Sequence, residues 1–329
     1  MYKALGRFPG GNGYSDISFR HTELWDTMPI PGGASRVAGT ALSSSAILFG
    51  DEQSGPVVLL LALAPGIKPP DAPAHTHASD NWRMSVLGNL PMGPDSYDAG
   101  HSRFQEGWKP YASDNYANGP DGGWTALMFA DRRGTRVRHV KQHDGPVITP
   151  MDRLLAEWLG VGGDLVAEEP ECGVPGPSVM ATTLDDFRRG ARINVSFHDT
   201  EHWLQRDGVS AMAGALGDHA SGPIVMQVRG GPDAEMLGQA TFECDLLRLV
   251  ARGSYTIDDR EYQAGDIRVQ AAGVAVGRAV AGSQGADEVV IFADRRAVGP
   301  QATAVELWSD MLARLGGDLA RRLADSAKA

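Results

Sequence analysis

Apolar residues in this chain occur in short runs that are interrupted by turns, a pattern that predicts β-strands. The segment 57–64, VVLLLALA, is apolar at every position and predicts a strand buried on both faces. Residues 246–250 and 255–262 flank a Gly-Ser turn, and a Gly-Asp turn then leads into a further strand at 266–270. Many short strands joined in this way are typical of a sandwich or a jelly-roll barrel. We therefore expect an all-β core.

Two segments have helical periodicity instead. Residues 150–159 place apolar side chains at helical spacing directly after Thr149, a plausible N-cap. Residues 304–324 carry leucine or methionine at every fourth position from Leu307 to Leu323. Such a stripe predicts a helix packed against a barrel, and in the second helix it would also suit the seam of a homodimer.

The chain repeats itself, because five short blocks occur twice and in the same order. The paired blocks are 18–25 with 196–203, 54–58 with 221–225, 97–100 with 262–265, 129–133 with 292–296, and 159–165 with 312–319. Ordered blocks of this kind indicate a duplicated structural unit. The sequence thus predicts two tandem barrels of one topology, each followed by an α-helix.

A linker divides the two units. Residues 168–177, EEPECGVPGP, are rich in proline, glycine and acidic residues, which is typical of a connecting segment. We place an N-terminal unit at 1–167, the linker at 168–179 and a C-terminal unit at 180–329.

Composition narrows the class of partner. The 42% hydrophobic and 22% charged fractions are ordinary for a globular protein, and the net charge of −11 argues against nucleic acid or an anionic membrane as the main partner. The only cysteines, Cys172 and Cys244, form no disulfide framework. The apolar run at 57–64 is too short to span a bilayer, and the first six residues lack the apolar region that is typical of a secretory signal. A cytoplasmic protein is the default expectation.

Two histidines carry the candidate chemistry. His75 and His77 stand two residues apart, so on a strand both imidazoles point to one face, and Asn81 and Arg83 continue the same parity. Imidazole pairs suit divalent transition metals. The alternative is a polar strand end with two solvated histidines.

This stretch resembles the first sequence motif of the cupin superfamily, G-x5-H-x-H-x3-E-x6-G. His75, His77 and Gly88 match that motif. Asn81 stands in place of the metal-binding glutamate, and Pro69 in place of the opening glycine. The resemblance implies the double-stranded β-helix, or jelly-roll, fold in each unit, and hence a bicupin.

The second cupin motif, G-x5-P-x-G-x2-H-x3-N, is matched at its ends by Gly100 and Asn115. In this register Glu106 replaces the proline, Trp108 replaces the second glycine and Tyr111 replaces the third metal histidine. Glu106 would supply the missing carboxylate only if its strand bulged.

The resemblance implies one divalent metal in the N-terminal barrel, whether Fe, Zn, Ni, Mn or Cu. We expect His75 and His77 as metal ligands, Tyr111 and Glu106 as catalytic groups, and Asn81, Arg83, Trp108 and Asn115 as substrate contacts. Their ligand would be a small organic molecule.

The C-terminal unit lacks these groups. Gly88 aligns with Gly253, and the same shift of 165 positions aligns Gly100 with Gly265. It places Ala240, Phe242, Leu246 and Val276 at the positions of His75, His77, Asn81 and Tyr111. Apolar side chains do not hold a divalent cation, so we expect a metal-free second barrel with Cys244 as a buried structural residue.

Three functions are compatible with these residues. The first is a metal-dependent enzyme of the dioxygenase or lyase type, with Tyr111 as the base in the lyase case. The second is a non-catalytic module that binds or senses a small molecule, and the third is a metal-free isomerase with a histidine base. The missing glutamate and third histidine support the second function, and metal analysis separates the last two from the first.

Overall fold

The computed structural model describes residues 13–27, 32–36, 42–51, 54–66, 72–92, 95–109, 111–113, 120–132, 137–138, 180–184, 192–297 and 306–326. Within these ranges the chain forms antiparallel sheets and one long helix. The N-terminal half contains β1 (Tyr14–Ser18), the 3-10 helix η1 (Phe19–Thr27), β2 (Gly32–Arg36), β3 (Leu42–Leu48), β4 (Val57–Leu63), β5 (Ala72–His77), β6 (Asn81–Leu87), β7 (Asn89–Met92), β8 (Asp95–Asp98), β9 (His101–Gln105), β10 (Tyr111–Ser113), β11 (Gly123–Phe129) and β12 (Val137–Arg138).

The C-terminal half repeats this pattern, and its described residues include the long helix α2. Its elements are β13 (Ala181–Thr182), β14 (Arg192–Ser196), β15 (Leu204–Arg206), β16 (Val209–Ala215), β17 (Ile224–Gly230), β18 (Glu235–Leu237), β19 (Ala240–Thr241), β20 (Leu246–Ile257), β21 (Arg260–Gln263), β22 (Asp266–Gln270), β23 (Ala275–Val276), β24 (Ala279–Phe292), the 3-10 helix η4 (Arg295–Ala297) and α2 (Glu306–Ser326).

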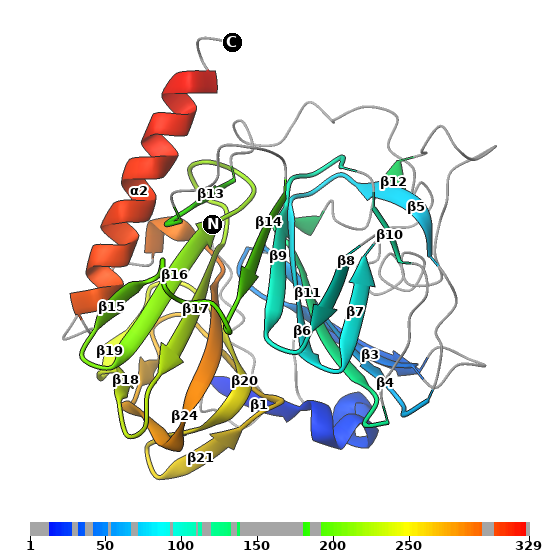
Figure 1. Cartoon of the computed structure of the whole chain (residues 1–329), viewed down its shortest axis with the longest axis horizontal. Coiled ribbons are helices and arrows are strands. Elements are labelled where there is room, and N and C mark those ends of the chain that lie inside the picture. Colours follow the sequence, from blue (N-terminus) through cyan, green and yellow to red (C-terminus); the bar gives the residue numbers. More distant parts are fainter. Residues whose placement is uncertain are drawn as a thin grey trace.

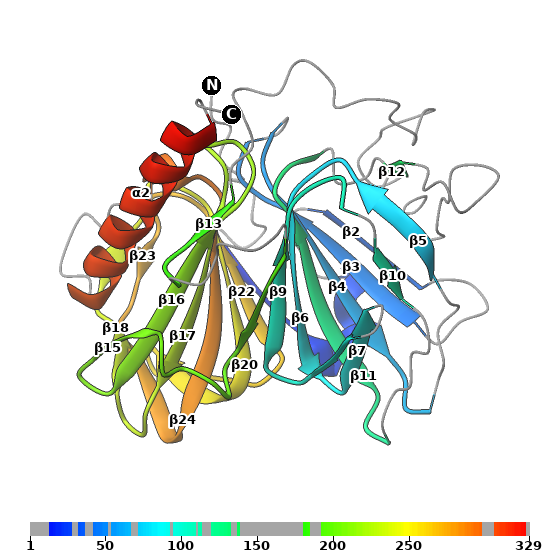
Figure 2. The same cartoon turned by 45° about the horizontal axis from the view of Figure 1, so that its top comes forward.

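The two large sheets have the same order over their five central strands, but one edge differs, because β2 pairs with β3 whereas both β13 and β15 pair with β16. One runs β14-β9-β6-β11-β4-β3-β2, and the other runs β1-β22-β20-β24-β17-β16-β13. The small pairs repeat as well, since β10 pairs with β5 and β23 pairs with β19. We call the β-structure built around β3–β12 the first barrel and that around β15–β24 the second barrel; they lie side by side (Figures 1 and 2). The predicted all-β tandem fold is confirmed.

Each half contributes one strand to the other half's sheet. β1 pairs with β22 in the second sheet, and β14 pairs with β9 in the first. Matching side-chain bonds fix both exchanged strands: Tyr262 and Arg268 donate to Asp16 over 3.2 and 3.1 Å, and Tyr97 and Arg103 donate to Asn194 over 3.0 and 2.9 Å. The two barrels are therefore interlocked, while the linker at 168–179 lies outside the described residues and stays a prediction.

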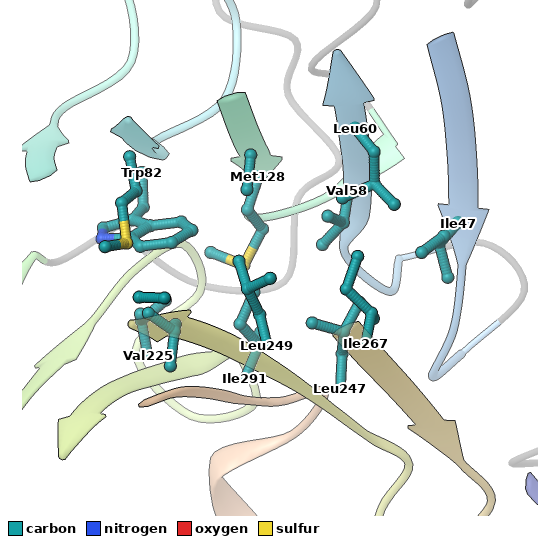
Figure 3. Packing of buried hydrophobic residues seen from close by; sticks show 14 of the residues in the cluster. Ile47, Val58, Leu60, Trp82, Met128, Val225, Leu247, Leu249, Ile267 and Ile291 are labelled. Atoms are coloured by element: carbon teal, nitrogen blue, oxygen red, sulfur yellow. The ribbon is translucent and has the colours of Figure 1, made fainter. Parts of the chain in front are cut away.

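The largest buried cluster lies between the two sheets, where they pack face to face (Figure 3). It joins Ile47, Val58, Leu60, Trp82 and Met128 of the first sheet to Val225, Leu247, Leu249, Ile267 and Ile291 of the second. Side chains alternate along a strand. Since Trp82 and Met84 of β6 face this interface, Asn81 and Arg83 face the interior of the first barrel.

Helix α2 lies on the outer side of the second barrel, away from the first (Figure 1). Leu307, Met311 and Leu315 are buried in the same cluster as the interior residues of that barrel. This part of the leucine stripe therefore packs within the chain, as predicted for a barrel-packed helix. The helix expected at 150–159 lies outside the described residues. Of the helices in the described part of the chain, none is both long and apolar enough for a membrane span.

Candidate functional site

His77 lies inside the first barrel. It ends β5 and is only 4% exposed. The centroid of its imidazole ring is 4.7 Å from the centroid of the Phe129 ring on β11. Phe129 belongs to a buried cluster with Val57 and Leu59. One of the two predicted metal ligands is thus enclosed rather than solvated, as the metal-site interpretation requires.

The backbone register brings His75 and Tyr111 together. They are direct partners in the antiparallel pair formed by β5 and β10, while β12 pairs with β5 at His77. Directly opposed residues are the closest neighbours in a sheet. The side chains of His75 and Tyr111, and all of Asn115, lie outside the described part of the structure. Among the described side chains, no three His, Cys, Asp or Glu residues form a metal-binding group.

Asn81 and Arg83 are coupled inside the first barrel. Both are buried, at 1% and 5% exposure, and Nη2 of Arg83 donates to Oδ1 of Asn81. The amide oxygen that occupies the place of the cupin glutamate therefore already accepts a hydrogen bond from a cation. In this arrangement Asn81 positions Arg83 rather than offering a strong metal ligand.

Trp108 has a strained backbone beside His77. Its φ is +62°, in the left-handed region that bulky residues avoid, and its N–H donates to the carbonyl of His77 over 2.7 Å. The equivalent residue of the second barrel is Gly273, with a φ of +77° and a matching 2.8 Å bond to the carbonyl of Phe242. The first barrel thus has a tryptophan at a left-handed position where the second barrel has glycine, the residue that adopts this backbone most readily.

The geometry of this turn is imposed by its surroundings. The amide of Gln105 donates to the carbonyl of Lys109 over 3.0 Å, and Asp80 accepts from the N–H of Gly107 over 2.7 Å. The second barrel repeats both bonds, from Gln270 to Val274 over 2.8 Å and from Ala272 to Asp245 over 2.8 Å. Because both barrels build the turn in the same way, the strain at Trp108 follows from its side chain alone.

Glu106 lies just beyond the end of β9 and is partly exposed. The β6–β9 register runs from Asn81↔Gln105 to Met84↔Ser102 without a shift, so no bulge occurs within this pair. Because Glu106 is outside the strand, the alternation of side chains along β9 does not fix its direction. Its catalytic role stays a prediction.

The second barrel has the predicted register and an apolar lining. Val276 pairs with Ala240 as Tyr111 pairs with His75. The rings of Phe242 and Phe292 lie 5.2 Å apart, in the arrangement of His77 and Phe129. Ala240, Phe242, Leu246 and Val276 are all buried. The predicted loss of the ligand positions is therefore confirmed at the level of register and burial.

One polar pair interrupts this apolar interior. Arg248 binds Glu288 through Nε and Nη2, over 2.5 and 2.8 Å, and the two side chains are 1% and 0% exposed. Burial alone would lower the pKa of Arg248, but the Glu288 carboxylate together with the nearby Tyr255 and Tyr262 outweighs burial and raises that pKa. The sequence predicts that Arg248 faces the barrel interior, because it lies two residues after Leu246 on the same strand. Glu288 was missed, because a glutamate in a strand predicts a solvent-facing position; its one signal is the apolar run that follows it.

Cys244 is a buried structural residue, as predicted. It is fully buried among the apolar residues of the second barrel, and burial raises the pKa of its thiol to about 12. A thiol that stays protonated is a poor nucleophile and a poor metal ligand.

A separate surface pocket of about 250 Å³ lies over the exchanged strand β1. Its lining includes Asp16, Arg20, Arg260 and Asp266. These charges are already paired, Arg260 with Asp16 and Arg20 with Asp266. The pocket therefore belongs to the contacts that hold β1 in place.

Comparison with known proteins finds similarity in fold only. No family model matches the chain, and no curated protein matches it either. Among solved structures, oxalate decarboxylase from Bacillus subtilis is 14% identical, with 85% of this chain and 77% of that chain covered and a TM-score of 0.43. A "putative dioxygenase" from Nostoc punctiforme is 11% identical, with 85% and 82% covered and a TM-score of 0.48. Likeness at this level does not identify a site or a reaction.

Proposed function

We propose that the first barrel holds the site of a metal-dependent cupin enzyme that acts on a small organic molecule, by a reaction of the dioxygenase or lyase type. The observation that carries the proposal is the contrast at one ladder position. His75 pairs with Tyr111 in the first barrel, whereas Ala240 pairs with Val276 in the second. The two barrels have the same register at this position, but only the first barrel has polar residues there. A duplicated unit in which one copy kept a functional site would show this contrast.

The residues present fit a modestly held divalent metal. His75 and His77 supply imidazole donors, and Tyr111 adds a phenol beside them. Asn81 offers only a neutral amide oxygen that already accepts a hydrogen bond from Arg83, so we do not assign it as a ligand. Few protein ligands leave coordination positions open for water or substrate, as catalytic metal sites require. A bound metal would polarise the substrate or activate water.

The other site residues act on the substrate. Tyr111 serves as the general base in the lyase case, and Trp108 forms a wall beside His77. Asn115 remains a proposed substrate contact, and Glu106 remains a proposed catalytic group that would have to reach the interior from the turn after β9. We further propose a cytoplasmic location, with a homodimer as one assembly.

Metal analysis of protein purified without a histidine tag tests the proposal. We expect about one divalent metal per chain, lost in His75→Ala and in His77→Ala and released at acid pH as the imidazoles protonate. His101→Ala is the matched control, because this partly exposed histidine lies next to His198 outside the barrel. Tyr111→Phe should retain metal if the hydroxyl is a base and lose it if the hydroxyl is a ligand.

One observation favours a second candidate, a metal-free binding module or isomerase. Arg83 places a buried positive charge close to the position of the missing glutamate, which opposes a dication. A folded, metal-free protein whose activity or ligand binding is unchanged by chelation would establish that alternative in place of the metal enzyme.

A further inference from the structure

One buried aspartate joins the two barrels close to His77. Asp80 lies in the turn between β5 and β6 and is 4% exposed. Its Oδ1 accepts from the backbone N–H of Gly107 in the same barrel, over 2.7 Å, and its Oδ2 accepts from the N–H of Gly217 in the second barrel, over 2.8 Å. A single side chain therefore ties the turn after β9 to the loop between β16 and β17. We call this pair of bonds the Asp80 clamp.

The turn that the clamp holds reaches the candidate site through its next residue. Trp108 follows Gly107, and its N–H donates to the carbonyl of His77 over 2.7 Å. The carbonyl of Asp80 accepts in addition from the N–H of Ala130 over 2.8 Å, at the end of the strand β11 whose last residue contacts the imidazole ring. Asp80 thus supports two backbone segments that adjoin the predicted ligand.

The left-handed backbone of Trp108 makes this support necessary. A bulky residue is strained in that region, and such strain persists only where the surrounding contacts impose the conformation. If the N–H of Gly107 lost its fixed acceptor, we expect the turn to relax and the N–H of Trp108 to leave the carbonyl of His77.

The second barrel contains an equivalent clamp. Asp245 is fully buried and accepts from the N–H groups of Ala272, in its own barrel, and of Gly50, in the first barrel, each over 2.8 Å. Here the next residue of the turn is Gly273, and the carbonyl that it binds belongs to Phe242. This clamp therefore holds an unstrained turn beside an apolar side chain, and it provides a matched control.

We infer that Asp80 is a positioning residue for the metal site proposed in the first barrel, and that the second barrel supplies its anchor through Gly217. The inference rests on the proposed function, which assigns His77 as a ligand. Asp80 acts on the backbone that holds the imidazole, as the outer contacts of a metal site do. The inference also gives the second barrel a role, because the barrel without ligand positions holds a turn of the barrel that has them.

Asp80→Asn tests the clamp at constant side-chain size. An amide accepts through one oxygen only, so one of the two backbone N–H groups faces an NH2 group and loses its bond. Amide hydrogen exchange of residues 106–109 should become at least about tenfold faster, because the loss of a buried hydrogen bond favours local opening. Adding Trp108→Gly to Asp80→Asn should restore most of the protection, because glycine adopts the left-handed backbone readily.

Asp245→Asn is the control, since it loses the equivalent bond in the other barrel. Its exchange should become faster at residues 271–274 and stay as in wild type at residues 106–109. Zinc affinity is measured on the same samples. We expect Asp80→Asn to bind Zn²⁺ about tenfold more weakly than wild type and Asp245→Asn to bind it equally well. A general loss of stability would affect both variants alike.

The inference is overturned if exchange at residues 106–109 is unchanged in Asp80→Asn, or if that variant opens the turn and still binds Zn²⁺ as tightly as wild type. A wild-type protein that binds no metal counts against the proposed enzyme, whereas the exchange comparison uses metal-free protein and tests the clamp alone.

Should Asp80→Asn not fold, hydrogen exchange of the wild-type protein decides. The amides of Trp108 and Gly217 should then be protected to a similar degree. A Trp108 amide that exchanges about a hundred times faster than that of Gly217 would show that the turn opens independently of the clamp, and would overturn the inference.

Discussion

The two barrels share a frame and differ in what they enclose. Strand order, register and turn bonds repeat, yet the first barrel has His77 beside Phe129 where the second has Phe242 beside Phe292. The comparison separates two kinds of conspicuous residue. A residue with the same contacts in both copies serves the frame, and a residue that is polar in one copy only is a candidate for chemistry.

The arginines that follow β11 and β24 illustrate the first kind. Arg132 donates to the carbonyls of Phe49 and Pro56, and Arg295 donates to those of Leu216 and Gly222. Both therefore close a loop against their own barrel by binding backbone. An arginine read from the sequence alone would have been an equally good candidate for anion binding.

The largest expected effect comes from breaking the ion pair of the second barrel. Glu288→Leu leaves Arg248 buried without its carboxylate, and the free energy of unfolding should fall by about 3–5 kcal/mol. Combining it with Arg248→Met should restore most of that loss, because a packed apolar pair replaces two buried charges. Urea denaturation of the single and double variants measures both. A single variant within about 0.5 kcal/mol of wild type would show that the pair does not stabilise the barrel.

A loss of similar size is expected from Phe242→Ala. Phe242 is almost fully buried against Phe292, so its removal should cost about 3–5 kcal/mol of unfolding free energy. His77→Ala at the equivalent position should cost less stability and remove the metal that we propose for this site. Denaturation and metal analysis of the two variants, side by side, test whether one position serves packing in one barrel and chemistry in the other.

The sequence predicts the repeated strands and turns well, because short-range sequence patterns determine them. The glycines that set the register have matching left-handed backbones, with φ of +76° at Gly88 and +71° at Gly253, and +90° at Gly100 and +88° at Gly265. Only glycine adopts these angles readily, so the turns are visible in the sequence. The stripe of α2 is visible as well, because residues four apart lie on one face of a helix.

The exchange of β1 and β14 could not be predicted in this way. Both strands follow the same local pattern, and either sheet would satisfy it, so the choice of partner depends on contacts distant in the chain. Glu288 was missed on similar grounds, since its burial depends on Arg248 from another strand. For Glu106 the prediction depended on a bulge, which the β6–β9 register lacks.

A smaller effect is expected at alkaline pH from Cys244. Burial raises the pKa of its thiol from 9.0 to about 12, so the folded protein keeps the thiol protonated at a pH where the unfolded chain loses the proton. The contribution of the neutral thiol to the unfolding free energy is therefore complete below pH 9 and is lost as the pH rises toward 12. At pH 10 the loss amounts to about 1 kcal/mol. Cys244→Ala should therefore lose less stability than wild type between pH 8 and pH 10, measured by urea denaturation. Equal losses in both proteins would mean that other groups, such as the buried Tyr255, account for the alkaline decline.

The smallest expected effect concerns the turn at Trp108 and at its counterpart Gly273, which has the same hydrogen bonds in both barrels. Trp108→Gly gives the first barrel the residue of the second and relieves a left-handed backbone, so the unfolding free energy should rise by about 1 kcal/mol. Gly273→Ala is the matched control: a Cβ there meets nothing within 4 Å, so its cost of about 1 kcal/mol reports backbone strain alone.

A gain in stability in Trp108→Gly would indicate a functional role for the indole only if binding at the proposed site weakens in the same variant. If Trp108 forms a wall of the proposed site beside His77, the variant should be more stable yet lose metal to a chelator more readily, and Gly273→Ala should retain metal as wild type does. Thermal denaturation with metal analysis of the same samples, before and after a chelator, measures both quantities. A Trp108→Gly protein that is less stable and retains metal as wild type does would show instead that the indole serves packing, and Trp108 would then join the residues of the frame.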